Sequence, residues 1–258
     1  RLGNHDFHCH SRHGPISLYR ALVQSCDVYY YNVGLKLGID RIAKWGKKFG
    51  LGATTGLVLD SEKPGLIPSS AWKKRRFHEP WHEGETPSVS IGQGYDLATP
   101  LQMVRVVAAM GNGGIIYVPT VVDKIVNPDG ETAYQFQPQI ASRLDASAKT
   151  LEAVRRACAG VVREGTGKAG RLGFVEVGGK TGTSQVVSLG KEGKGKNRRK
   201  TQDHAWFVAF APVENSQIAV AVIIEHGGHG GTAAAPAARE VMREFFKLKA
   251  ADKEAAKS

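Results

Sequence analysis

Two short motifs carry side chains whose types and spacing could do chemistry. Ser25-Cys26-Asp27 places a hydroxyl and a carboxylate two residues apart, and Lys180-Thr181-Gly182-Thr183 places an ammonium beside two hydroxyls and a glycine. If residues 25–27 join two helices, the Ser25 and Asp27 side chains can point into one cleft; alternatively, they only cap a helix. If Lys180 lies on an edge strand, Gly182 lets a ligand backbone come close; alternatively, the segment is an ordinary glycine-rich strand.

The Gly-Lys-Thr string at 179–181 also invites comparison with a phosphate-binding loop. That loop needs a glycine five residues before the Gly-Lys pair, and Phe174 occupies this position. A phosphate loop must also open a helix, whereas the pattern around Lys180 runs from strand to strand. The sequence therefore argues against nucleotide binding.

A third group of reactive side chains lies near the start of the chain. Five metal-ligating residues fall within nine positions: His5, His8, Cys9, His10 and His13. Cys26 follows thirteen residues after His13, and cysteine with histidine suits tetrahedral zinc. The alternatives are a free buried Cys26 or a Cys9–Cys26 disulfide.

Composition limits the class of protein. The 258 residues can bury a core without help from a metal or disulfide, and 41% apolar with 23% charged residues exclude a disordered or fibrous chain. We expect no membrane span, because no run approaches ~18 apolar residues, and no signal peptide. The net charge of +11 suits an anionic partner. Because the chain opens at Arg1 without a start-like segment, we expect it to be a piece of a longer protein.

Periodicity and turn residues predict an α+β fold, an antiparallel sheet with helices on its faces. We expect helices from Ile16, over 26–37, 39–50, 147–163 and 233–249, and one from a Thr99 cap with Pro100 and Gln102 to Met110. We expect a hairpin of two strands within 115–137 around residues 127–130, and further strands at 174–188, 205–211 and 217–225. Residues 60–96 read as an ordered, packed loop, the basic run 191–200 as a solvated loop, and 250–258 as a disordered tail.

The two motifs, in this order, resemble the second and third motifs of the serine penicillin-binding proteins and β-lactamases. Segments that resemble class B transpeptidase signatures run through the chain: 65–68, 90–95, 99–102, 165–167, 204–207 and 225–231. Asp27 followed by Val28 to Tyr31 is similar to the elongation type. The resemblance implies a penicillin-binding/β-lactamase-like transpeptidase fold, incomplete at the N-terminus, with residues 1–249 as the C-terminal part of that domain.

The nucleophile motif of this family, Ser-x-x-Lys, should precede Ser25. Ser70-Ala71-Trp72-Lys73 has this pattern, but it lies downstream of the second motif, beside Lys74 and other basic residues. We interpret it as a coincidence in a solvated basic segment. The resemblance therefore implies that the acylated serine and its lysine precede this chain, and that the isolated chain is inactive.

The resemblance assigns roles in a peptidoglycan D,D-transpeptidase. Ser25 would relay a proton to the leaving amine, Asp27 would orient the substrate amide, and Lys180 would place positive charge beside the substrate carboxylate. Thr181 and Thr183 would bond that carboxylate, with Gly182 between them, and the Thr183 N–H would serve the oxyanion hole. The alternative within the same fold is a non-catalytic sensor or scaffold, and a basic nucleic-acid binder is a weaker alternative.

The resemblance also implies partners and one structural zinc. Some elongation-type members hold zinc at this place; His13 and Cys26 match their His and Cys, and Cys9 or Asp6 would complete the set. Acyl transfer itself requires no cofactor. Expected partners are peptidoglycan stem peptides, β-lactams and membrane proteins of the elongation complex, with no nucleic acid. The expected location is the periplasmic, extracytoplasmic face of the inner membrane, with an N-terminal anchor helix outside this sequence.

Overall fold

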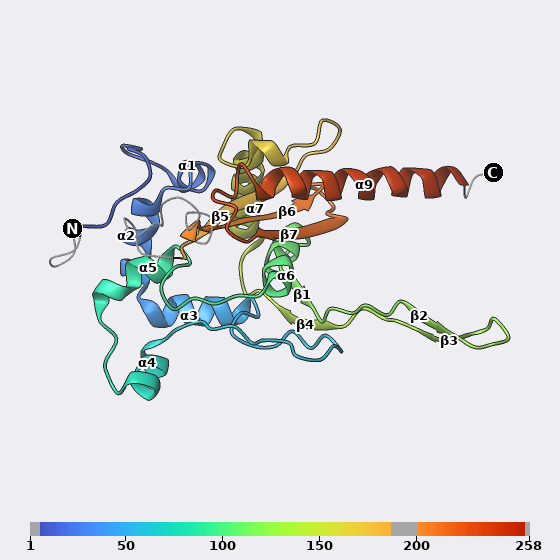
Figure 1. Cartoon of the computed structure of the whole chain (residues 1–258), viewed down its shortest axis with the longest axis horizontal. Helices are drawn as coiled ribbons and strands as arrows, with labels where there is room; N and C mark the ends of the chain where they lie inside the picture. Colours follow the sequence, from blue (N-terminus) through green and yellow to red (C-terminus); the bar gives the residue numbers. More distant parts are fainter. Residues whose placement is uncertain (1–5, 187–200, 256–258) are drawn as a thin grey trace.

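A computed structural model describes residues 6–186 and 201–255 (Figure 1). Its helices are α1 (Leu18–Val23), α2 (Asp27–Leu37), α3 (Ile39–Lys48), α4 (Ser70–Phe77), α5 (Thr86–Ser90), α6 (Pro100–Gly111), α7 (Ala148–Arg163) and α9 (Ala234–Ala255), with 3-10 turns η1 (Glu83–Glu85) and η2 (Lys168–Gly170). Its strands are β1 (Ile115–Tyr117), β2 (Lys124–Val126), β3 (Thr132–Gln135), β4 (Ile140–Arg143), β5 (Gly178–Ser184), β6 (His204–Ala211) and β7 (Ile218–Ile224). The predicted α+β class is confirmed.

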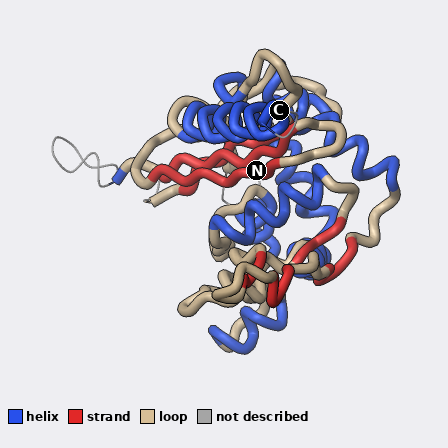
Figure 2. Tube along the Cα trace, turned by 90° about the vertical axis from the view of Figure 1, so that its right-hand side faces the viewer, coloured by secondary structure: helices blue, strands red, loops and turns tan. Residues whose placement is uncertain are grey.

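The main sheet is antiparallel and has the order β5-β6-β7. Helix α9 packs on β6 and β7, while α6 and α7 contact the sheet from another side. Figure 2 shows the strands of this sheet lying beneath the long C-terminal helix, with further helices below them. Strand β5, which carries the Lys180 motif, is therefore an edge strand of the described sheet, as expected.

Strand β6 divides the core into two clusters because its side chains alternate between the two faces. Ala205, Phe207 and Ala209 belong to the cluster formed with α9. Val208 and Phe210 belong to the cluster formed with α6 and α7. The first face is buried, and the second is half-buried at Trp206 and Val208 and fully buried at Phe210, so apolar side chains follow one another along the strand.

Glycines surround the fully buried ring of Phe207. A Cβ atom at Gly170 would lie 2.7 Å from the ring, and at Gly179 or Gly167 it would lie 2.9 or 3.0 Å away. The ring thus fills space that these three segments leave free, and it brings the turn at 165–170 against β5 and β6. Thr166 is held at this place by a bond from its N–H to the Val23 carbonyl.

Helix α6 begins with the predicted capping box. The Thr99 hydroxyl accepts from the Gln102 N–H at 3.2 Å, and the Gln102 carbonyl oxygen accepts from the Thr99 N–H at 2.9 Å. The buried Gln102 amide also donates to the carbonyls of Ala53 and Pro64. One residue therefore starts the helix and fastens the preceding loop to it.

The segment 60–96 is ordered and packed, as predicted, but it is not one loop. It contains α4, η1 and α5, and Trp72, Phe77 and Trp81 pack around the ring of Tyr95. The prediction of a solvated basic segment is wrong for Lys73, which is 3% exposed. Its ammonium lies 2.5 Å from Glu85, so a carboxylate twelve residues later allows it to be buried.

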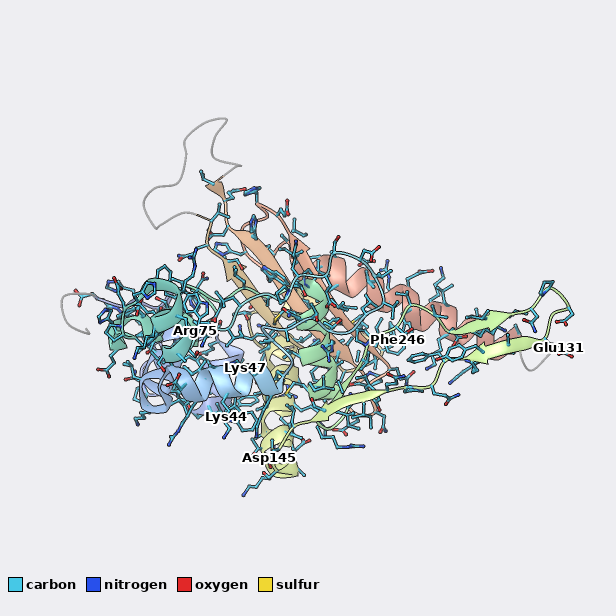
Figure 3. The ribbon with its side chains drawn as sticks, turned by 90° about the horizontal axis from the view of Figure 1, so that it is seen from below. Lys44, Lys47, Arg75, Glu131, Asp145 and Phe246 are labelled. Carbon is cyan, nitrogen blue, oxygen red and sulfur yellow. The ribbon has the colours of Figure 1, made fainter. Side chains whose placement is uncertain are left out.

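The segment 115–137, predicted as two strands, contains the three short strands β1, β2 and β3, and β4 follows it. Strand β1 pairs with β4, and β2 pairs with β3 around the predicted turn, where the Asn127 N–H donates to Glu131. The β2–β3 hairpin is exposed along both strands. Figure 3 shows Glu131 at its far end, away from the body of the molecule.

Two other boundaries differ from expectation. Strand β5 covers 178–184, so residues 174–177 and 185–186 of the predicted strand lie outside it, and residues 187–188 are not among the described residues. Helix α9 continues to Ala255, into the predicted tail. Residues 250–254 are all exposed in this helix, and their alanines, lysine and glutamate are strong helix formers. The basic run 191–200 lies outside the described residues. Within the described part of the chain, no helix has the length and apolar character needed to cross a bilayer.

We predict that Gly170→Ala destabilises the fold by about 1–3 kcal/mol, because the new methyl group would overlap the Phe207 ring. Thermal or urea unfolding measures the change. Gly173→Ala is the matched control, since nothing lies within 4 Å of its Cβ position, and its stability should stay within about 0.5 kcal/mol of the parent. Equal losses in both variants would contradict the account of Phe207 packing.

Candidate active site

Lys180 and Ser25 meet although 155 residues separate them. The Lys180 ammonium donates to the Ser25 hydroxyl at 2.8 Å and to the carbonyl of Thr181 at 2.8 Å. The bond joins edge strand β5 to the junction between α1 and α2. The structure therefore brings the two sequence motifs into one site.

The backbone at Ser25 explains why its hydroxyl is free to reach Lys180. Ser25 has φ of 53°, a left-handed conformation that is uncommon for a residue with a side chain. Cys26, not Ser25 or Asp27, takes the N-cap position of α2, and it makes no side-chain cap bond. The alternative that this triplet only caps a helix is therefore wrong: it joins two helices, and Asp27 lies in the first turn of the second.

The Lys180 ammonium is partly shielded from solvent. Burial lowers the pKa of Lys180 to about 8, because it disfavours the ammonium form. Nearby Cys158 and Asp27 act in the opposite direction and favour the charge. Asp27 thus influences the site electrostatically, and its carboxylate also lies 3.9 Å from the ring of His10.

The hydroxyl of Thr181 bonds to that of Thr166 at 2.8 Å. In the sheet register Lys180 faces Val208 and Thr181 faces Phe207, so the two neighbouring side chains leave β5 on opposite faces. Thr183 follows Thr181 by two positions and shares its face of the strand. The predicted binding of a carboxylate by Thr181 and Thr183 stays a prediction.

Gly182 lies where the strand meets two neighbours. A Cβ atom there would lie 3.1 Å from the Cβ of Trp206, and one at Gly230 would lie 2.5 Å from the Gly182 carbonyl. The glycine-rich segment after His226 therefore packs directly against β5. Close packing within the protein is therefore one reason for a glycine at position 182. The predicted approach of a ligand backbone would be a second reason.

Ser70 and Lys73 take no part in this site. The Ser70 hydroxyl donates to Asp40 at 2.7 Å, and Lys73 is paired with Glu85. Each side chain is committed to a different carboxylate, and neither makes a bond to Ser25 or Lys180. This geometry agrees with the interpretation of the Ser70–Lys73 string as a coincidence.

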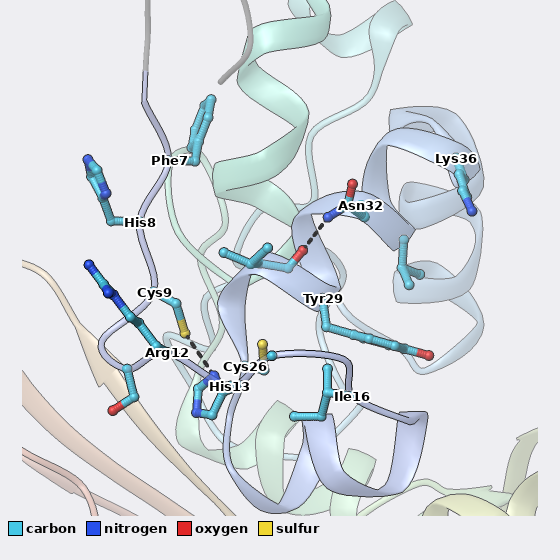
Figure 4. Close-up of a pocket in the computed structure, with 14 residues that line it drawn as sticks. Phe7, His8, Cys9, Arg12, His13, Ile16, Cys26, Tyr29, Asn32 and Lys36 are labelled. Atoms are coloured by element: carbon cyan, nitrogen blue, oxygen red, sulfur yellow. Dashed lines mark hydrogen bonds between the residues drawn. The ribbon is translucent and has the colours of Figure 1, made fainter.

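The Cys/His cluster lies beside the same helix junction. The ligand atoms of Cys9, His13 and Cys26 lie within 4.8 Å of one another, and Cys9 Sγ is 3.5 Å from His13 Nδ1 (Figure 4). In a zinc tetrahedron a sulfur and a nitrogen are roughly 3.6 Å apart, so this pair fits such a site. The cysteines are free, so the predicted alternative of a Cys9–Cys26 disulfide is not formed. His5 lies outside the described residues.

No role at this site was predicted for three residues that the structure places there. Thr166 bonds Thr181, Gln93 donates to the Thr183 carbonyl at 2.7 Å, and Cys158 influences the pKa of Lys180. Thr166 and Gln93 stand inside segments that resemble family signatures, whereas no spacing or periodicity distinguishes Cys158. His10, predicted only as part of the Cys/His group, lies 3.9 Å from Asp27.

We predict that a lysine signal in carbon-13 NMR titrates with a midpoint near pH 8 and is absent in Lys180→Arg. Asp27→Asn should move the midpoint lower, because it removes a charge that favours the ammonium. Between about pH 8 and 10.5, the unfolded chain binds the proton that folded Lys180 has lost, so this residue makes the fold more stable as pH rises. A midpoint above 10 would contradict the desolvated position.

The chain is similar to a known protein family and to characterised proteins. A family model described as the penicillin-binding protein transpeptidase domain matches residues 2–243. The peptidoglycan D,D-transpeptidase MrdA of Haemophilus influenzae is 38% identical over 254 residues. The alignment covers 91% of this chain and 37% of MrdA, so the chain spans little more than a third of that relative.

Solved structures give the same picture. The penicillin-binding protein PBP2 of Helicobacter pylori matches with a TM-score of 0.81 at 29% identity, over 96% of this chain and 43% of that one. Its complex with MreC matches with a TM-score of 0.80 at 28% identity, over 96% and 43%. Pseudomonas aeruginosa PBP2 in complex with WCK 5153 has a TM-score of 0.80 and 34% identity, over 95% and 52%.

These matches cover the Ser25 and Lys180 motifs and the sheet between them. The expected transpeptidase fold is confirmed, and the similarity to elongation-type members is confirmed with it. With a family model extending over residues 2–243 of 258, the chain belongs to the penicillin-binding protein transpeptidase domain family.

Proposed function

We propose that this chain supplies the second and third motifs of a serine-type peptidoglycan D,D-transpeptidase, a cell-wall cross-linking enzyme that binds penicillin. One observation carries the proposal: the 2.8 Å bond between Lys180 Nζ and Ser25 Oγ. It joins a lysine whose pKa is about 8 to a hydroxyl, a pair able to exchange a proton near neutral pH. Membership of the transpeptidase family supports the choice of reaction.

In this proposal the nucleophile is a Ser-x-x-Lys serine in a preceding part of a longer protein. Its hydroxyl attacks the carbonyl between two D-alanines of a stem peptide, which forms an acyl-enzyme and releases the terminal D-alanine. The lysine of the same motif accepts the proton of the attacking hydroxyl, and Ser25, poised between that lysine and Lys180, relays a proton to the leaving amine. Asp27 orients the substrate amide, Thr181 and Thr183 bind its carboxylate, and the Thr183 N–H stabilises the oxyanion.

We also propose that Cys9, His13 and Cys26 hold one structural zinc. The support is the donor chemistry, two sulfurs and an imidazole nitrogen that converge within 4.8 Å. Cys9 also belongs to a second, separate group with His10 and Asp27, whose ligand atoms lie within 4.8 Å of one another. A zinc ion here would brace the turn that presents Ser25, and it would have no step in acyl transfer.

The proposed setting is the periplasmic face of the inner membrane, with an anchor helix elsewhere in the longer protein. Membrane proteins of the elongation complex are proposed as partners. The support is indirect: PBP2 of Helicobacter pylori, which this chain resembles, has been solved together with MreC.

We predict that the longer protein is labelled covalently by a fluorescent penicillin and that residues 1–258 alone are not. Lys180→Ala in the longer protein should lower the labelling rate on the order of 10²–10³, because it removes the positive charge and the proton partner of Ser25. Lys247→Ala, an exposed lysine of α9, is the control and should leave the rate unchanged. Labelling of the isolated chain at Ser70 would refute this assignment, and an unlabelled longer protein would favour a sensor or scaffold.

We predict one zinc per chain in native mass spectrometry. Cys26→Ser and His13→Ala should each abolish binding, because each removes one of three converging donors. Cys158→Ser is the matched control, a buried cysteine outside the cluster, and it should retain the metal. Absence of zinc from the unmutated chain after purification with added zinc would refute the site.

A further inference from the structure

Gln93 links a remote loop to the strand that carries Lys180. Its side-chain amide donates to the backbone carbonyl of Thr183 at 2.7 Å, across 90 positions of sequence. The acceptor lies three residues beyond Lys180, in the same strand β5.

The accepting carbonyl faces the outer edge of the sheet. Among the described residues β5 pairs with β6 on one side only, and the backbone groups of an antiparallel strand point alternately toward and away from the partner. The carbonyls of Thr181 and Thr183 both accept from side chains, those of Lys180 and Gln93. Residues 181 and 183 therefore turn their backbone groups outward, and the Thr183 N–H points to the same side as its carbonyl.

The loop that carries Gln93 is fastened to the helix of the second motif. Gln93 stands between Gly92 and Gly94, whose φ angles are 78° and 72°, and its N–H donates to the backbone carbonyl of Ser88 in α5. Helix α5 packs tightly on α2, since a Cβ at Gly34 would lie 2.4 Å from the Cβ of Ser90. Gln93 is thus coupled through α5 to the helix that begins at Asp27.

A buried ion pair fixes the other side of this loop. Glu85 accepts from Lys73 at 2.5 Å with one oxygen and from the Tyr95 hydroxyl at 3.3 Å with the other. Tyr95 follows Gln93 by two residues, and its ring packs against Trp72 and Trp81. The loop is therefore held on both sides of Gln93, by α5 on one side and by Tyr95 on the other, and the Gln93 side chain extends from it to β5.

We propose that Gln93 is a positioning residue that sets the orientation of Thr183 at the outer edge of β5. By holding the Thr183 carbonyl, it fixes the backbone of the residue whose N–H faces the reacting carbonyl of the substrate. This inference rests on the proposed transpeptidase function. The amide acts through Thr183 and touches neither substrate nor nucleophile.

The first arm of the test uses residues 1–258 and needs no activity. Gln93→Met keeps the side-chain length and removes the donor, so the nitrogen-15 NMR signal of Ser184, which shares the peptide group of the Thr183 carbonyl, should shift. Gln135→Met is the matched control, since Gln135 likewise donates to a backbone carbonyl, that of Asp123, in the remote hairpin. An unmoved Ser184 signal in Gln93→Met would overturn the proposal.

The second arm measures penicillin acylation of the longer protein. Gln93→Met should lower the second-order acylation rate about 10- to 100-fold, while the Lys180 titration stays near pH 8 and Gln135→Met reacts normally. An unchanged rate would overturn the positioning role and leave Gln93 as a structural tie. A rate that falls together with a displaced Lys180 titration would also overturn it, because the site as a whole would have loosened. If the unmutated longer protein is not acylated, the proposed function fails, while the Ser184 arm still tests the contact.

Discussion

The contact between the Lys180 ammonium and the Ser25 hydroxyl determines how the molecule can be arranged. It requires an edge strand and a break between two helices to meet, although they belong to different layers of the fold. The break must be sharp, which explains the left-handed backbone at Ser25. The strand must place Lys180 on the face that meets the α1–α2 junction, and the register that sets Lys180 opposite Val208 does so. A left-handed serine and a buried lysine are each unfavourable for stability, and both are needed for the contact between Lys180 and Ser25.

The opposite face of β5, which carries Thr181, packs against the Phe207 ring. Thr181 faces Phe207, and the glycines around that ring allow the turn at 165–170 to come close enough for Thr166 to bond Thr181. Packing and site geometry are therefore connected. The close packing of glycines around the Phe207 ring places the Thr166 hydroxyl beside β5. Lys180 leaves the other face of β5, where it bonds Ser25 at the junction of α1 and α2, and its burial there lowers its pKa.

Much of this could be predicted from the sequence because the signals were local. The capping box at Thr99 and the strands around 205–211 and 217–225 depend on neighbouring residues, and the order of the two motifs identified the family. Contacts across the fold could not be predicted in this way. Gln93 finds Thr183 only after α5 has packed on α2, and no periodicity records that event.

The same distinction explains where prediction was wrong. The basic run after Ser70 indicated a solvated segment, yet Lys73 turns inward because Glu85, in a different local element, supplies the compensating charge. The end of α9 was misjudged for another reason. A charged, alanine-rich stretch reads equally well as a tail or as the last turns of a helix, and helix propensity favoured the second outcome.

The exposed β2–β3 hairpin gives the molecule a natural place for attachment. All of its strand residues face solvent, and the turn at 127–130 lies away from the sheet that carries Lys180. A two-stranded ribbon gains little stability by itself, so its tip can be lengthened, nicked or fitted with a fluorophore or an affinity peptide at small cost. The hairpin thus offers a handle by which the site can be observed without being touched.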